Sequence, residues 1–195
     1  MLPGIILGLS LHEFAHAWMS DKLGDPTPRR QGRLTVNPLA HIDWIGFAAL
    51  VLVGFGWGKP VEINTSYYKN KRRDEFLVAI AGVTMNLLIA VVLSFPTKAL
   101  MKAYYSSGSA LLENITYIFY YAVMINLVLM IFNLIPCPPL DGWNIVTQLF
   151  KLDKYDWWYK VYQYGTWILL ALILLNVTDM IITPGVSALM RLLGL

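Results

Sequence analysis

Long apolar runs alternate with short polar segments along this chain of 195 residues. Four of the runs are long enough, or nearly so, for a helix that crosses a bilayer, which needs about 20 residues. They cover residues 2–19, 76–95, 115–135 and 164–182. A fifth run, residues 45–57, is shorter and contains three glycines. The pattern predicts an all-α membrane protein with about four transmembrane helices.

The composition agrees with this prediction. Hydrophobic residues make up 57% of the chain and charged residues 14%, whereas soluble domains have about 45–50% and about 25%. The length suits a single domain, residues 1–195. Cys137 is the only cysteine, so no disulfide can form within the chain. The first run lacks the basic start of a secretory signal, and we do not expect it to be removed.

Basic residues lie on both sides of the short fifth run. Lysine and arginine near membrane segments mark the cytoplasmic face, so both flanks of residues 45–57 are predicted to be cytoplasmic. One crossing cannot satisfy this, and we interpret the run as a re-entrant segment. Three lysines make residues 151–162 a further cytoplasmic loop, which puts both termini outside. The flanking basic residues are Lys22, Arg29, Arg30, Arg33, Lys59, Lys69, Lys71, Arg72 and Arg73.

Ionisable residues interrupt the first apolar run, in the sequence SLHEFAHAW. His12 and His16 are four residues apart, so on a helix they lie on one face, one turn apart. Two imidazoles in this arrangement can bind one zinc ion, and Glu13 can then act as a general base. HExxH patterns also arise by chance in soluble helices. Ionisable groups inside a membrane segment are costly, however, and by default indicate a functional site.

A zinc hydrolase uses three protein ligands, so a third must come from elsewhere in the chain. The candidates are His41, the only other histidine, and Asp141. Asp141 follows a segment with three prolines, which cannot continue the preceding helix. Its depth matches that of His12, roughly 13 Å inside the cytoplasmic boundary at ~1.5 Å per residue. An aspartate before glycine is usually a turn residue, but these features favour Asp141 as the third ligand.

HEFAH on a membrane helix, followed later by NLIPCPPLDG, resembles the site-2 protease family of intramembrane zinc metalloproteases. The stretches LGDPTPRRQGRLTVNPLAHID, FGWGKPVEIN and AGVTMN are also typical of its compact members, which lack a PDZ or nucleotide-sensing domain. The resemblance covers most of residues 11–142. It implies one zinc ion per chain, held by His12, His16 and Asp141, with Glu13 as the catalytic base. The family usually has proline where Val83 stands.

Three more polar residues are candidates for the site. Asn86 lies in a charge-free run, where an amide commonly bonds to a neighbouring helix. The family resemblance implies instead that Asn86 holds the substrate backbone or polarises the scissile carbonyl. His41 either supports the site or contacts the substrate, or is simply polar at the start of the re-entrant segment. We expect Asn133 to brace the segment that carries Asp141.

Glycines, aromatic residues and a proline characterise residues 54–64. This composition fits an edge strand or a β-hairpin on the cytoplasmic side. A protease needs its substrate extended, because a helix hides its peptide carbonyls, and an edge strand can pair with an extended peptide. The alternative is a structural plug that seals the cavity.

We therefore expect an intramembrane zinc metalloprotease that hydrolyses peptide bonds in transmembrane segments of other proteins. Its partners would be these substrates and the lipid bilayer, without nucleic acid. We predict a prokaryotic cell membrane, with the active site towards the cytoplasm. One alternative is a catalytically silent relative that binds or regulates membrane proteins, although the complete HExxH motif with Asp141 argues against it. A zinc transporter would need more metal sites than three histidines allow.

Overall fold

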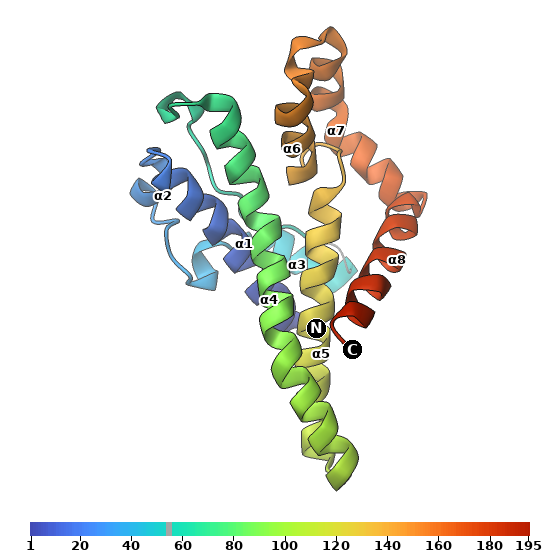
Figure 1. Ribbon diagram of the computed structural model, residues 1–195. Helices are drawn as coiled ribbons and strands as arrows, with labels where there is room; N and C mark the ends of the chain where they lie inside the picture. Colours follow the sequence, from blue (N-terminus) through green and yellow to red (C-terminus); the bar gives the residue numbers. More distant parts are fainter. Residues whose placement is uncertain (54–55) are drawn as a thin grey trace.

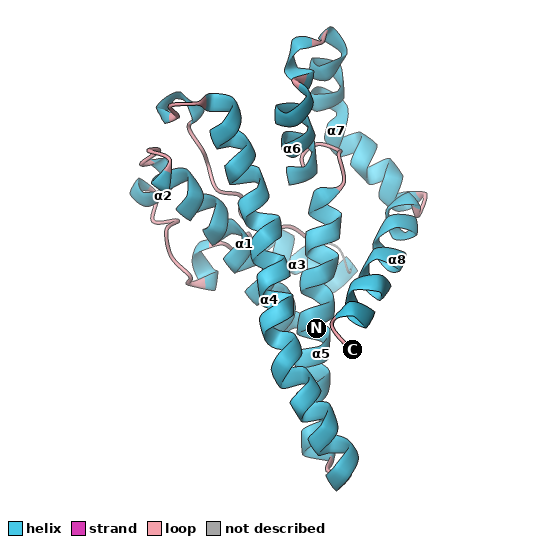
Figure 2. Cartoon of the chain, in the orientation of Figure 1, coloured by secondary structure: helices cyan, strands magenta, loops and turns pink. Residues whose placement is uncertain are grey.

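The computed structural model describes residues 1–53 and 56–195, and this part of the chain contains helices and loops but no β-strand (Figure 2). Two long antiparallel helices form the centre (Figure 1). They are α4 (Lys71–Ser107) and α5 (Ala110–Leu134), joined through Gly108, whose φ of 63° suits glycine. The 37 residues of α4 extend about 55 Å, well beyond the ~30 Å of a hydrocarbon core.

The first helix, α1 (Leu2–Lys22), packs against both central helices. Its closest approach to α5 is at two glycines four residues apart. A Cβ atom on Gly4 would lie 2.7 Å from Ala122 Cα, and one on Gly8 would lie 2.9 Å from Asn126 Oδ1. Small residues at this spacing let membrane helices approach closely. The contact turns the histidine face of α1 towards the interior.

The remaining helices surround this three-helix centre. After α5, the chain forms two helices at the end of the molecule where α4 begins, and α8 then returns along α5 (Figure 1). Val186 and Met190 of α8 pack there against Ala90, Val123 and Leu127. The elements not yet given are α2 (Thr27–Arg30), η1 (Pro38–Ala40), α3 (Trp44–Val53), η2 (Thr65–Tyr67), α6 (Asp141–Phe150), η3 (Leu152–Lys154), α7 (Asp156–Leu174) and α8 (Val177–Leu192).

Helices α4 and α5 are long and apolar enough to cross a membrane. Together, α7 and α8 make a third candidate span if the bent pair is counted as one. The 21 residues of α1 are long enough, but its HExxH motif lowers its hydropathy. The described residues therefore support two or three of the four predicted crossings, and the crossing by residues 2–19 stays a prediction.

The helix expected over residues 164–182 is broken. α7 ends at Leu174, α8 begins at Val177, and the two are bent by 70°. Asn176, between them, has the left-handed φ of 56°, a conformation that asparagine tolerates better than most residues. The chain does not break at Pro184, because α8 continues through it.

The region expected to be re-entrant contains α3, a regular helix of 10 residues. Residues 54–55 lie outside the described residues, so the start of the expected hairpin cannot be compared. The connecting segment, residues 56–64, makes one antiparallel bridge, between Ile42 and Gly58. Elsewhere its backbone bonds to side chains: Val61 N–H donates to Glu13 at 2.9 Å and Asn64 N–H to Asp25 at 2.8 Å. These carboxylates accept hydrogen bonds that the second strand of the expected β-hairpin would have accepted.

Asp25 is fully buried between α1 and the connecting segment. Its carboxylate accepts hydrogen bonds from Ser20 Oγ at 2.9 Å, Thr27 N at 2.9 Å and Asn64 N at 2.8 Å. Burial alone would raise the pKa of Asp25, but these hydrogen bonds outweigh it and lower the pKa below its ordinary value. Ionised Asp25 therefore stabilises the folded protein.

We expect Asp25→Ala to reduce stability by about 2–4 kcal/mol at neutral pH, because one buried and two partly buried donors lose their acceptor. The stabilisation is present above the ordinary pKa of about 3.9 and is lost as the pH falls through the lower pKa of the folded state. Thermal unfolding of the wild type and the variant, from pH 7 towards pH 2, measures this. The difference in Tm should shrink in acid; a constant difference would contradict the prediction.

Candidate metal centre

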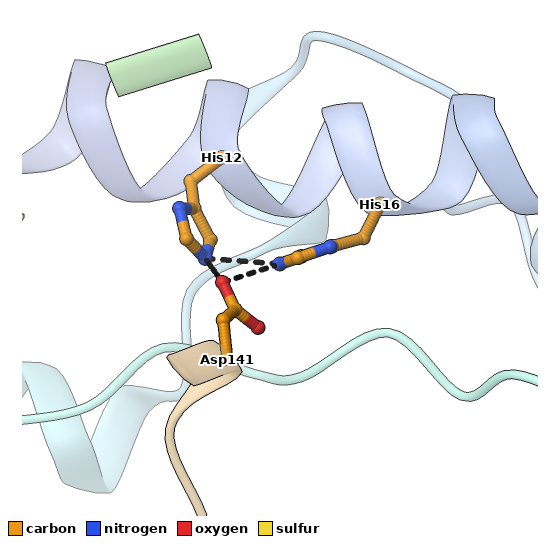
Figure 3. A group of neighbouring side chains, drawn as sticks. All are labelled: His12, His16 and Asp141. Atoms are coloured by element: carbon orange, nitrogen blue, oxygen red, sulfur yellow. Dashed lines mark hydrogen bonds and ion pairs between the residues drawn. The ribbon is translucent and has the colours of Figure 1, made fainter. Parts of the chain in front are cut away.

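Three side chains that can bind a metal meet where α1 faces the start of α6 (Figure 3). His12 and His16 project from consecutive turns of α1, and their Nε2 atoms are 3.0 Å apart. Asp141 Oδ2 lies 3.1 Å from His12 Nε2 and 3.2 Å from His16 Nε2. Among the described residues, no other group of His, Cys, Asp and Glu side chains is close enough to share an ion.

The proline-rich segment, residues 135–140, directs Asp141 towards the histidines. α5 ends at Leu134 and α6 begins at Asp141, so the prolines interrupt the helix as the sequence predicted. Gly142 allows the short connection, because a Cβ atom there would lie 2.5 Å from Ile135 O. The carboxylate is thus held by a rigid element on either side.

Hydrogen bonds on the far side of each imidazole fix its orientation. His16 Nδ1 donates to Val78 O at 2.8 Å, and His12 Nδ1 donates to Asn86 Oδ1 at 2.7 Å. Because these oxygens only accept, each Nδ1 carries a proton, and in the neutral imidazole each Nε2 then presents a lone pair. Asp141 Oδ2 is buried and finds no hydrogen-bond donor in the described part of the chain.

Two imidazole nitrogens and one carboxylate oxygen therefore lie 3.0–3.2 Å apart in a buried site. With both imidazoles neutral, these atoms repel one another unless a cation lies among them. Two imidazole nitrogens and a carboxylate oxygen form a set that catalytic zinc accepts. Atoms that surround one ion at zinc–ligand distances of about 2.0–2.2 Å are about 3.3 Å apart. The residues present fit a zinc ion.

Glu13 lies beside this group on a cavity of 460 Å³ that His12, His16 and Asp141 also line. Its Oε2 accepts a hydrogen bond from Val61 N–H of the connecting segment. Three residues of that segment form part of the cavity wall: Pro60, Val61 and Ile63. An acid–base group, a metal-binding set and a stretch of backbone thus share one space.

Asn86 is fully buried behind His12, and it is not among the residues that line the cavity. Besides its bond to His12, its Nδ2 donates to Gly8 O and to Asn126 Oδ1, both at 3.1 Å. The amide therefore has no free hydrogen-bonding hydrogen for a substrate. This arrangement favours the helix–helix alternative of the sequence analysis, with the added feature that one partner is His12.

His41 and Asn133 are the other two candidates for the site, and only Asn133 lines the metal cavity. His41 is buried near the start of α3, where its Nε2 donates to Thr35 O at 2.8 Å. Asn133 lines the metal cavity, but its Nδ2 donates to Leu129 O one turn back in α5, at 3.0 Å. Within residues 1–53 and 56–195, no hydrogen bond joins Asn133 to the Asp141 segment, so the expected brace is not found there.

Sequence reasoning missed Asn126 and Gly82. Asn126 is an amide in an uncharged run, as Asn86 is, and the same criterion applied to residues 115–135 would have found it. Gly82 of α4 makes room for the imidazoles: a Cβ atom there would lie 2.6 Å from His12 Cε1 and would collide with His16 Nε2. Gly82 lies in the AGVTMN stretch, but its contact with the imidazoles depends on how α1 and α4 pack.

Similar proteins are found among the peptidases. Peptidase family M50 matches residues 96–176. YwhC of Bacillus subtilis is 35% identical over 185 residues, which cover 94% of this chain and 84% of YwhC. Rip2 of Mycolicibacterium smegmatis is 29% identical over 153 residues, which cover 74% of this chain and 54% of Rip2. Both relatives are named zinc metalloproteases. No solved structure matches the chain.

The apolar helices, the site and these similarities together define a membrane protein of the metalloprotease class. The chain belongs to peptidase family M50. Members of this family depend on zinc, in agreement with the nitrogen and oxygen donors that meet between α1 and α6.

Proposed function

We propose that this protein is an intramembrane zinc endopeptidase that cleaves transmembrane segments of other membrane proteins, with His12, His16 and Asp141 as the zinc ligands. One observation carries the proposal: two imidazole nitrogens and a carboxylate oxygen converge at 3.0–3.2 Å between helices of an apolar bundle. A zinc ion there would supply Lewis acidity that polarises the peptide carbonyl. The candidate ligands open onto the neighbouring cavity of 460 Å³.

Glu13 is proposed to handle the protons of the reaction. Its carboxylate takes a proton from the water that attacks the peptide carbonyl and delivers it to the departing amide nitrogen. The C–N bond breaks, and the products are a carboxylate and an amine. The hydrogen bond from Val61 N–H supports this role, because it holds Glu13 on the wall of the cavity at 2.9 Å from a fixed backbone group.

The substrate is proposed to unwind and lie along the connecting segment. Extended peptides commonly bind by adding to exposed backbone, and Pro60, Val61 and Ile63 line the cavity next to the candidate ligands. Cleavage of membrane-protein substrates by the purified, zinc-loaded protein tests the proposal. A chelator should stop cleavage and added zinc should restore it. Binding of membrane proteins without cleavage would favour the catalytically silent alternative.

The site is proposed to open towards the cytoplasm of a prokaryotic cell, because basic residues gather at the Lys71 end of α4. Single cysteines at Lys71 and Ser107, the two ends of this helix, test the orientation. A membrane-impermeant thiol reagent added outside intact cells should label position 107 and leave position 71 unlabelled. Equal labelling would contradict the orientation.

Asn86 is proposed to orient His12 by accepting its Nδ1 proton, at 2.7 Å. We expect Asn86→Leu to weaken zinc binding by about 10–100-fold, as is usual when the hydrogen-bond partner of a metal-bound histidine is lost. Competition with a chromophoric chelator measures the zinc Kd. Asn133→Leu is the matched control, because Asn133 lies outside this network; an equal loss in both variants would remove the special role of Asn86.

A further inference from the structure

The metal cavity contains one carboxylate that the proposed chemistry does not use. Glu75 lies in the first turns of α4 and lines the same 460 Å³ cavity as the candidate ligands and Glu13. Its side chain is 22% exposed. No lysine or arginine is among the residues that line the cavity. A bound zinc ion would balance Asp141 and Glu13, so Glu75 gives the cavity an additional negative charge.

The neighbours of Glu75 compensate this charge only in part. Lys71 Nζ is 3.9 Å from Glu75 Oε1, and the Lys71 side chain is 70% exposed, so water screens the pair strongly. Gln148 donates a neutral hydrogen bond to Oε2. Two nearby arginines are already paired: Arg72 with Asp153 at 3.0 Å and Arg73 with Asp74 at 2.8 Å. The Glu75 carboxylate can therefore form an ion pair with a cation inside the cavity.

The position of Glu75 along α4 gives its distance from the metal centre. Gly82 marks the level of the two imidazoles, because a Cβ atom on it would touch both. Glu75 precedes Gly82 by seven residues, which is close to two turns, so the two residues lie on the same face of the helix. They are about 10 Å apart along its axis at 1.5 Å per residue. An extended peptide advances about 3.3 Å per residue. Glu75 thus lies about three substrate residues from the metal.

We infer that Glu75 recognises a basic side chain of the substrate, about three residues from the cleaved bond on the Lys71 side of the site. This inference rests on the proposed peptidase function and names a substrate class for it: membrane segments with lysine or arginine at that flank. Under the proposed orientation this flank is cytoplasmic, where membrane proteins concentrate lysine and arginine. The carboxylate then sets which bond reaches the metal.

The test uses designed single-span peptides in lipid vesicles, identical except that one lysine is moved stepwise along the cytoplasmic flank. Mass spectrometry of the products identifies the bond that wild-type protein cuts. We expect the cut to move with the lysine and to stay about three residues from it. Replacing the lysine with glutamine should reduce cleavage about five- to tenfold, and added salt should reduce this preference. A cut that ignores the lysine would overturn the inference.

Two variants separate recognition from support of the fold. In Glu75→Gln, the amide can still bond to Gln148, but the charge is gone, so the cut should no longer follow the lysine. Asp156→Asn removes an exposed carboxylate at the start of α7 that does not line the cavity, and it should leave the preference intact. Retention of the lysine preference in Glu75→Gln would assign Glu75 a purely structural role.

Binding distinguishes failure of this inference from failure of the proposed function. The lysine and glutamine peptides are titrated against zinc-loaded Glu13→Gln protein, in which binding is measured without turnover. Equal affinity for both peptides would overturn the recognition by Glu75, even if wild-type protein cleaves them. A lysine preference in binding, with no cleavage of any peptide by the wild type, would support Glu75 recognition and overturn the peptidase function.

Discussion

Replacing Asp141 with alanine is expected to remove zinc and activity together. Asp141 Oδ2 completes the set with the two imidazole nitrogens, at 3.1 and 3.2 Å, and nothing else in the described chain stands in the same position. Loss of a residue that only supports a ligand costs about 10–100-fold in metal affinity. The loss of a ligand itself should exceed about 100-fold, and two histidines alone should not retain zinc through purification.

His41→Ala is the matched control for this prediction. It removes a buried histidine whose Nε2 bonds to Thr35 O, away from the three candidate ligands. We expect the purified variant to keep its zinc, even if turnover falls. Metal analysis of both proteins decides the matter: a zinc-loaded Asp141→Ala protein beside a zinc-free His41→Ala protein would reverse the assignment of the third ligand.

Replacing Glu13 with glutamine is expected to abolish cleavage while zinc stays bound. The change is isosteric, so Val61 N–H can still donate to the amide oxygen and the connecting segment keeps this anchor. Only the ability to accept a proton is lost. General acid–base groups contribute about 10²–10⁴-fold to rates. The activity should therefore fall by at least about 10²-fold.

Zinc content and substrate affinity provide the other measurements on Glu13→Gln. Both should equal those of the wild type, because Glu13 is not one of the three converging ligand candidates. Loss of zinc from the variant would mean that Glu13 binds the metal. Full activity would assign proton transfer to another group on the cavity wall.

Patterns within one element predicted much of the fold, and contacts between elements account for what they missed. Apolar runs located α4 and α5, whose hydropathy follows directly from their residues. The break after Leu174 depends on the conformation of Asn176, inside a run that reads as continuous. The absence of a hairpin in residues 56–64 arises because Glu13 and Asp25, distant in sequence, bond to its backbone.

The site shows the same division. The spacing of His12 and His16 predicted their shared face, and the prolines pointed to Asp141. The roles of asparagines were less accessible, because an amide bonds to whatever faces it. For Asn86 the family resemblance implied a substrate contact, with a helix–helix bond as the alternative. Asn86 lies behind His12 with both of its amide hydrogens used. Asn133 was expected to brace the segment that carries Asp141, whereas its Nδ2 bonds within α5.

The contact at Gly82 means that activity requires position 82 of α4 to carry no side chain. One added methyl group would intrude on both imidazoles while leaving His12, Glu13, His16 and Asp141 in the sequence. A gene could therefore lose the activity through a single glycine-to-alanine change and still display a complete motif. Whether an intact HExxH sequence denotes a working enzyme can thus be decided by a residue 66 positions beyond it in the chain.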